Sequence, residues 1–198
     1  AIQNATRTPK LLNASQYAVL SNDMMNNSGN AANPAWADPS VLGKGTDWVD
    51  ELLRTGYMQN YTLSYSGGSD KAHYYVSGGM LDQTGIVRSV KYRRFTFQQN
   101  ADAQVLPWLK MASNITVSAD RKQQGSYDLG STYKALPVFA VKDENGEWTG
   151  PEGNSLWYGS VRNPIGPTTT DHSSTKGYNL LGNISAEVSF TKWLKLKS

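Results

Sequence analysis

The stretch His73–Val87 reads HYYVSGGMLDQTGIV and decides how the rest of the chain is interpreted. Large side chains alternate with polar or small neighbours, which is the period of a β-strand. The side chains on the greasier face are Tyr74, Val76 and Met80, and those on the other face are His73, Tyr75 and Ser77. Gly78 and Gly79 interrupt the run, and a glycine inside a strand marks a bend or a close approach of another backbone. The stretch predicts a strand with one apolar face and one polar face.

Four further stretches repeat this period of two. They are NYTLSYSGG, RFTFQQN, WLKMASNITVSAD and YNLLGNISAEVSF. Each places apolar side chains on one face and Asn, Ser, Thr, Gln or Lys on the other. The apolar positions that we expect to face lipid in a membrane are Leu63, Val76, Phe97, Ile115 and Ile184. Five strands of about ten residues result, close to the 9 to 11 residues that cross a bilayer at a tilt.

Composition restricts the classes of protein. The 198 residues include no cysteine, which excludes a disulfide framework and a thiolate metal site. The net charge of +3 comes from scattered Lys and Arg rather than from a basic run, so nucleic acid is not an expected partner. A mean hydropathy of -0.52 is low for a domain with a large interior. No run of 18 apolar residues occurs, which excludes a transmembrane helix but not a transmembrane barrel.

The connections between the expected strands alternate in length. SGGSDK, NADAQVLP and FTK are the short ones, whereas DQTGIVRSVKY and the segment from about Arg121 to Lys176 are longer. Outer-membrane barrels have this alternation, with short periplasmic turns and long extracellular loops. Trp108 and Trp193 each open a Trp-Leu-Lys triplet after a short turn, a position that suits an interfacial aromatic girdle. An ordinary hairpin would explain these two tryptophans equally well.

The predicted fold class is therefore all-β, a partial transmembrane antiparallel β-barrel with long extracellular loops and one or two short helices. A membrane barrel must close, and closure takes at least about eight strands. The five to six strands expected here therefore belong to a larger barrel. We expect four segments of one barrel domain: 1–56 as an extracellular loop segment with short helices, 57–121 as four strands, 122–175 as a long extracellular loop, and 176–198 as further strands.

Two helices are expected before the first long strand. Asn13 is a predicted N-cap for ASQYAVLSNDMMNNS, with Tyr17, Leu20 and Met24 at helical spacing and Gly29 as the stop. Asp47 is a predicted N-cap for WVDELLR. The carboxylates near the start of this second helix are explained by capping and by the helix dipole rather than by catalysis.

The long loop carries the candidate binding residues. Trp148, Trp157 and Tyr158 lie among Gly, Pro and Asn, and exposed aromatic faces stack on sugar rings or pack against a protein lid. Packing of the loop on itself is the alternative explanation. Asp143–Gly146 resembles the start of a calcium loop but lacks the later ligands, and is better interpreted as a hairpin turn. His73 and His172 have no metal-binding spacing, and no nucleophile or nucleotide motif occurs, so we expect no catalytic residue, metal or cofactor.

Five stretches in order carry a family resemblance: TDWVDELLRTG, QNYTLSYSGGSDK, YYVSGGMLDQTGIV, RRFTFQQNAD and WLKMASNITVS. They resemble the early barrel of the SusC/RagA family, the TonB-linked outer-membrane transporters of Bacteroidota. The resemblance runs from about Leu11 to Ser118 and resumes at NPIGPTTTDHSSTKGYNLLGNISAEVSFTKWLKLKS, which leaves Ala119–Arg162 as a variable loop. The stretch YYVSGGMLDQTGIV is its most specific part.

The resemblance implies an importer in the outer membrane of a Gram-negative bacterium, energised through TonB. The implied partners are a SusD-like surface lipoprotein, an oligosaccharide or peptide substrate, and the lipid bilayer. The family transfers no fixed set of substrate residues onto these positions. A soluble β-rich glycan-binding module is the alternative, and it would have to bury the apolar positions between two sheets.

Overall fold

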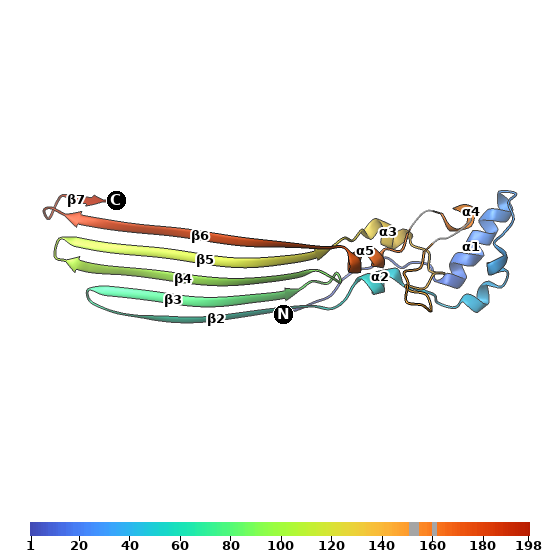
Figure 1. The fold of residues 1–198 in the computed structure, drawn as a ribbon, viewed down its shortest axis with the longest axis horizontal. Helices are drawn as coiled ribbons and strands as arrows, with labels where there is room; N and C mark the ends of the chain where they lie inside the picture. The colour runs from blue at the N-terminus through green and yellow to red at the C-terminus, as the bar shows by residue number, and fades with distance from the viewer. Residues whose placement is uncertain (151–154, 160–161) are drawn as a thin grey trace.

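Strands form one half of an elongated molecule and helices occupy the other half (Figure 1). The computed structural model describes residues 1–150, 155–159 and 162–198. The described residues form one seven-stranded antiparallel sheet in which every strand pairs with the next along the chain. The strands are β1 Ile2–Gln3, β2 Gly56–Ser69, β3 Ala72–Thr84, β4 Lys91–Leu106, β5 Leu109–Gly125, β6 His172–Ser189 and β7 Lys195–Lys197. The sheet stays open, which confirms the predicted fold class of a partial barrel.

Short and long connections lie at opposite ends of the sheet. At the end away from the helices, Asp70–Lys71 joins β2 to β3, Pro107–Trp108 joins β4 to β5, and 190–194 joins β6 to β7. The longer connections, 85–90 and 126–171, lie with the helices (Figure 1). We call these two ends the turn end and the helix end. The predicted alternation of short and long connections is confirmed.

Three predicted boundaries are wrong, because the strands are longer than the apolar pattern. The stretch NADAQVLP is not a turn, since 100–106 belongs to β4. The expected loop after Arg121 starts only beyond Gly125, and β6 begins at His172, before Lys176. β5 and β6 have 17 and 18 residues rather than about ten. At the ends of β5 and β6, pairing continues through residues that are polar on both faces, so the alternation that identified the strands is absent there. In β4 the alternation does continue, with Ala101, Ala103 and Val105 on one face, but its small side chains made the stretch resemble a turn.

β3 also extends further than predicted, because it runs to Thr84, so the connection expected to start at Asp82 (DQTGIVRSVKY) begins only at Gly85. The strand passes through Gly78 and Gly79 without a break in register. A Cβ atom at Gly78 would meet nothing within 4 Å, and at Gly79 its nearest neighbour would be the Tyr61 carbonyl oxygen at 3.4 Å. Within this chain, therefore, neither glycine is required by a close approach.

The helices begin where the sequence supplies caps. They are α1 Ala14–Asn27, η1 Pro34–Trp36, η2 Pro39–Leu42, α2 Trp48–Leu52, α3 Leu129–Lys134, α4 Ser155–Tyr158 and α5 Ile165–Thr170. The Asn13 side chain accepts a hydrogen bond from the Gln16 N–H, and Asp47 accepts from the N–H groups of Val49 and Asp50, which confirms both predicted caps. Gly29 has the left-handed φ of 71° expected of a helix stop. Among the described residues, no helix is long and apolar enough to cross a membrane.

α1 buries a different face from the one predicted. Leu20 and Met24 are 59% and 54% exposed, whereas Ala18 and Ser21 are buried. Small side chains let the helix lie close to its neighbours: the Gly45 backbone comes so near that a Cβ there would stand 2.5 Å from the Ala14 Cβ. Close approach therefore outweighs the apolar spacing that the sequence suggested.

Candidate functional site

Strand register brings the apolar side chains of five strands onto one face of the sheet. Direct cross-strand neighbours include Tyr65, Val76, Gln99 and Ile115 in one row. The apolar face, as we call it, comprises Tyr61, Leu63, Tyr65, Tyr74, Val76, Met80, Phe95, Phe97, Met111, Ile115, Val117, Tyr178, Leu180, Ile184 and Val188. The prediction that Leu63, Val76, Phe97, Ile115 and Ile184 share a face is confirmed.

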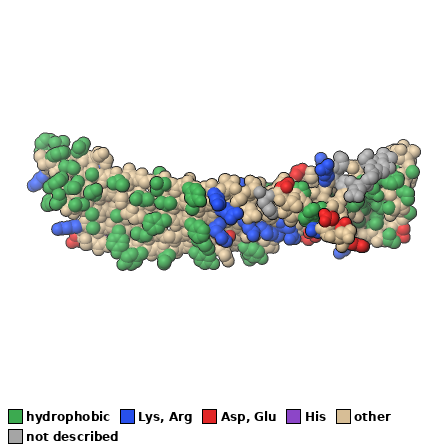
Figure 2. Space-filling view, in the orientation of Figure 1, with side chains coloured by type: hydrophobic (Ala, Val, Ile, Leu, Met, Phe, Trp, Pro, Cys, Tyr) green, Lys and Arg blue, Asp and Glu red, His purple; other side chains and the backbone are tan. Residues whose placement is uncertain are grey.

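No other described part of the chain covers this face. Leu63 is 81% exposed, Leu180 is 75% exposed and Ile184 is 70% exposed. The strands contact one another, and the described helices lie beyond their helix end rather than over them (Figures 1 and 2). An apolar surface of this size requires an apolar environment that the chain does not supply.

The height of the apolar face matches a bilayer. It runs along β6 from Tyr178 to Val188, ten residue steps, which correspond to about 34 Å of strand at about 3.4 Å per residue. A tilt of about 45° reduces this length to about 24 Å, the height of the apolar band of outer-membrane barrels.

Aromatic side chains border both edges of this band. At the helix end of the band, one cross-strand row contains Tyr61, Phe95 and Tyr178. At the turn end, Trp108, Phe190 and Trp193 are 49%, 62% and 83% exposed. Trp108 and Trp193 lie in the turns themselves, one residue before β5 begins and two residues before β7 begins, rather than at the strand starts that the sequence suggested. Two aromatic borders about a bilayer apart are the arrangement of interfacial girdles.

The opposite face is polar, and we call it the polar face. One of its rows includes Asn100, Asn114 and Asn183, which are direct cross-strand neighbours. Charged groups on this face pair near the turn end, where Lys110 Nζ lies 3.1 Å from Asp102 Oδ2 and Lys195 Nζ lies 3.0 Å from Glu187 Oε1. Hydrogen-bonding and charged groups of this kind suit a water-filled interior rather than lipid.

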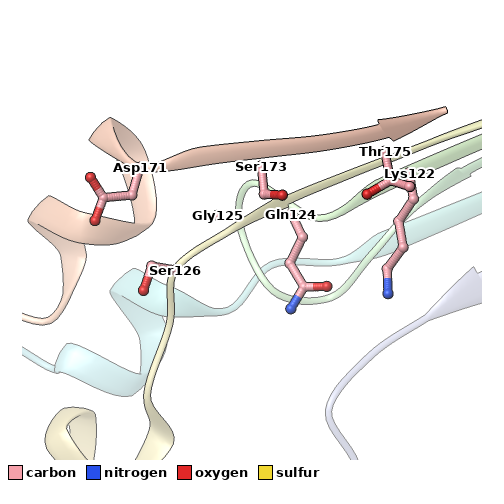
Figure 3. Close-up of a pocket in the computed structure, with 7 residues that line it drawn as sticks. All are labelled: Lys122, Gln124, Gly125, Ser126, Asp171, Ser173 and Thr175. Carbon is pink, nitrogen blue, oxygen red and sulfur yellow. The ribbon is translucent and has the colours of Figure 1, made fainter.

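A polar pocket of about 570 Å³ opens on the polar face where β5 and β6 leave the sheet (Figure 3). It is lined by Lys122, Gln124, Gly125, Ser126, Asp171, Ser173 and Thr175. Lys122 and Gln124 extend from β5 in the same direction, and Asp171 lies at the far end of the pocket from Lys122 (Figure 3). Gly125 is required here, because a Cβ would stand 2.4 Å from both the Thr168 carbonyl oxygen and Ser89 Oγ. The pocket offers donors and acceptors to a polar ligand.

The helix end has its own small hydrophobic core. Trp48, Leu52, Ala135 and Ile165 are buried together, and they come from α2, α5 and the end of α3. Trp48 Nε1 donates to the Leu136 carbonyl oxygen at 2.8 Å, which satisfies the polar atom of the indole. Segments far apart in sequence are thereby held together beyond the sheet.

Trp148, the first candidate binding residue, packs against this core. Lys142 Nζ lies 4.4 Å from its ring centroid, and a Cβ at Gly166 would meet the ring at 3.4 Å. Lys142 and Trp148 pair across the turn in which Asp143 accepts from the N–H groups of Asn145 and Glu147. The predicted hairpin turn is confirmed, and the Asp143 carboxylate is used to hold it.

The other two candidates belong to an aromatic cluster near α1. The Tyr158 ring lies 5.7 Å from Trp36, 5.4 Å from Phe139 and 6.4 Å from Trp157, measured between centroids. Trp157 Nε1 donates to the Ala31 carbonyl oxygen, and Asn33 Nδ2 donates to the Tyr158 hydroxyl. Trp157 and Tyr158 are thus brought together and Trp148 is held apart from them. Residues 151–154 and 160–161 of this loop and the His172 side chain lie outside the described residues.

An apolar cleft of about 770 Å³, which the sequence did not predict, lies between the N-terminal segment and α3. Its walls include Leu11, Leu12, Tyr17, Trp48, Tyr133 and Pro137, and three lysines line it as well, Lys10, Lys44 and Lys134. Burial raises the pKa of Tyr17 here. The only signal in the sequence was the run of apolar residues at Leu11–Leu12, which has no period.

Comparisons with known proteins agree with this geometry. No family model matches the chain. The TonB-dependent receptor P3 of Formosa agariphila is 27% identical over 210 residues, covering 100% of this chain and 19% of that receptor. The TonB-dependent receptor SusC of Bacteroides thetaiotaomicron is 40% identical over 72 residues, covering 35% of this chain and 7% of that receptor. The chain thus spans about a fifth or less of the length of these relatives.

Solved structures show the same fold. The RagAB peptide importer in its closed-closed state matches with a TM-score of 0.69 at 20% identity, covering 99% of this chain and 26% of that chain. A second structure of the RagAB peptide transporter matches with a TM-score of 0.56 at 25% identity, covering 77% of this chain and 18% of that chain.

An open antiparallel sheet with one lipid-height apolar face and one polar face is a segment of a transmembrane β-barrel wall. The particular barrel that this segment resembles is that of the SusC/RagA-like TonB-dependent receptors, in agreement with the sequence resemblance. Its location in the cell outer membrane of a Gram-negative bacterium is confirmed with it. The relatives are named as receptors and importers rather than as enzymes.

Proposed function

We propose that this chain forms part of the barrel wall and outer loops of a TonB-dependent importer of nutrients. Strands β1 to β7 are the wall, and the connections 4–55, 85–90 and 126–171 at the helix end are extracellular. The observation that carries the proposal is the register, which separates an apolar face from a polar face over five neighbouring strands. The longer loops gather at one end of these strands, as in a barrel whose long loops are extracellular.

TonB supplies the energy and a SusD-like lipoprotein covers the outer loops in this proposal. The substrate is an oligosaccharide or a peptide. Support comes from the names of the similar proteins, since one is SusC and another is a peptide importer. The polar pocket beside Lys122 and Gln124 suits either substrate, because both carry many hydrogen-bonding groups.

The alternative, a soluble glycan-binding module, has less support. Such a module would pack a second sheet over the apolar face, and the described strands form a single sheet. With Leu63, Leu180 and Ile184 exposed to this degree, a monomer of this fold in water would aggregate.

Trp148, Trp157 and Tyr158 remain our candidates for contact with substrate or lid. Their packing within the loop accounts for their burial but leaves part of the Trp157 and Tyr158 surfaces accessible. Binding through an aromatic face predicts that Trp157→Ala weakens uptake whereas Trp157→Phe largely preserves it. Loss of the hydrogen bond to Ala31 alone would make the two variants equally defective, since both lack the indole N–H.

The test uses the full-length receptor in a strain that lacks its own copy. Uptake of a labelled oligosaccharide and of a labelled peptide is measured, together with recovery of the lipoprotein complex. We expect TonB-dependent uptake of one substrate class, reduced by Trp157→Ala. Uptake of neither class would contradict the importer, and unchanged uptake and complex recovery with Trp157→Ala would remove the binding role of the aromatic residues.

A further inference from the structure

Three cations stand side by side on the apolar face, just beyond its helix-end border. Arg93 on β4 pairs directly with Arg121 on β5, and Arg121 pairs directly with Lys176 on β6. All three side chains are exposed. Figure 2 shows Lys and Arg side chains gathering between the hydrophobic part of the strands and the helices. We call Arg93, Arg121 and Lys176 the cation row.

The cation row by itself lowers the stability of the sheet, because like charges directly opposite one another on neighbouring strands repel. The Asp82 carboxylate pairs with the Arg93 guanidinium and is the single carboxylate that the described residues of β2–β6 place on this face. Arg121 Nε donates to the neutral Ser174 hydroxyl at 3.0 Å. Three positive charges and one negative charge give the row a net charge of +2. Lys91 is the next residue of β4 on the same face, two residues before Arg93 and further from the apolar band. An external anion would relieve this repulsion.

The depth of the row identifies which anion can reach it. Phe95 and Tyr178, each two residues closer to the turn end on the same face, form the aromatic border of the apolar band. Two residue steps correspond to about 7 Å of strand, or about 5 Å of height at a tilt of about 45°. Lipid acyl chains that cover the band therefore end at the border, and their headgroups lie at the level of the cation row.

We propose that Arg93, Arg121 and Lys176 bind the phosphate group of an anionic membrane lipid whose acyl chains lie on the apolar face. Guanidinium groups bind phosphate oxygens in pairs, and a lysine adds a point charge. The lipid accounts for both halves of the surface, because its chains cover the band and its phosphate neutralises the row. This proposal rests on the proposed barrel wall.

The test compares lipid binding by full-length receptors purified in a nonionic detergent. The variant carries Arg93→Gln, Arg121→Gln and Lys176→Gln, and the matched control carries Arg94→Gln and Lys122→Gln, which lie at the same depth on the polar face. Native mass spectrometry measures the affinity for phosphatidylglycerol and for phosphatidylcholine, with and without millimolar inorganic phosphate.

We expect the wild type and the control to prefer phosphatidylglycerol, and the variant to lose about fivefold in affinity per cation removed, which corresponds to about 1 kcal/mol per cation. Equal loss in the control and the variant would overturn the site. Displacement of phosphatidylglycerol by inorganic phosphate would show a soluble-anion site instead of a lipid site. A receptor that dissolves without detergent would refute the barrel wall itself, whereas a folded, detergent-requiring receptor with unchanged lipid preference would refute the cation row alone.

Discussion

Placing an arginine at the middle of the apolar band tests the barrel wall through its energetics. Ile184 lies near the midpoint between the two borders of the band and is 70% exposed on the isolated chain. An arginine on the lipid face near the bilayer midplane costs about 2–4 kcal/mol. Loss of the isoleucine removes up to about 2 kcal/mol of apolar burial. A total near 4 kcal/mol would lower the ratio of folded to unfolded receptor about 700-fold.

The assay is reversible folding of the full-length receptor into phospholipid vesicles, followed by guanidinium titration. The matched control is Asn183→Arg, since Asn183 is adjacent in sequence, lies at the same depth and belongs to the polar face. We expect Ile184→Arg to unfold at a distinctly lower guanidinium concentration, and Asn183→Arg to remain within about 1 kcal/mol of the wild type. Equal destabilisation by both variants would refute the assignment of the faces, as would a larger effect of Asn183→Arg.

Three further predictions concern the helix end and are measured by hydrogen exchange on the full-length receptor. Leu52→Ala removes a fully buried side chain and should destabilise the small core by about 2–5 kcal/mol, so that α2 and α5 exchange faster; unchanged exchange would contradict this core. Gly125→Ala should cost about 1–3 kcal/mol through its clash with Thr168, whereas Gly182→Ala, whose Cβ would meet nothing closer than 4.0 Å, should be neutral. Hydrogen bonds from the Ser131 hydroxyl and from backbone N–H groups lower the pKa of the Asp128 carboxyl. The carboxylate therefore stabilises α3 fully above the unfolded pKa of about 3.9, and this stabilisation is lost as pH falls through the lower folded pKa. Asp128→Asn should remove this pH dependence of exchange in α3.

The faces of the sheet could be predicted from sequence because a bilayer enforces strict alternation. Leu63, Phe97 and Ile184 must meet lipid, so the period of two is complete wherever the strand crosses the band. Outside the band both faces of the sheet meet water, so alternating apolar and polar side chains along a strand do not stabilise the structure there. The ends of β5 and β6 were missed for this reason, since their pairing is marked only by backbone hydrogen bonds.

The candidate site was less predictable because it depends on contacts between distant segments. Trp157 and Tyr158 stood out as aromatics in a polar loop, but nothing local indicated that Trp36 would lie 5.7 Å from the Tyr158 ring. The face of α1 was predicted wrongly for a similar reason, since the close approach of Gly45 to Ala14 is a tertiary contact. The cation row likewise depends on register, which brings Arg93, Arg121 and Lys176 into one line although each lies in a separate strand.

A nitroxide scan along β6, in the full-length receptor in phospholipid vesicles, tests directly whether the apolar face meets lipid. This part of the receptor has no cysteine, so single cysteines at 179–186 can carry the label one at a time. Relaxation by oxygen reports lipid, and relaxation by a water-soluble nickel chelate reports aqueous surroundings. We expect positions 180, 182, 184 and 186 to be accessible to oxygen and positions 179, 181, 183 and 185 to be inaccessible to it, with the chelate showing the opposite phase. Accessibility without a period of two, or with the phase reversed, would contradict a barrel wall with its apolar face toward lipid.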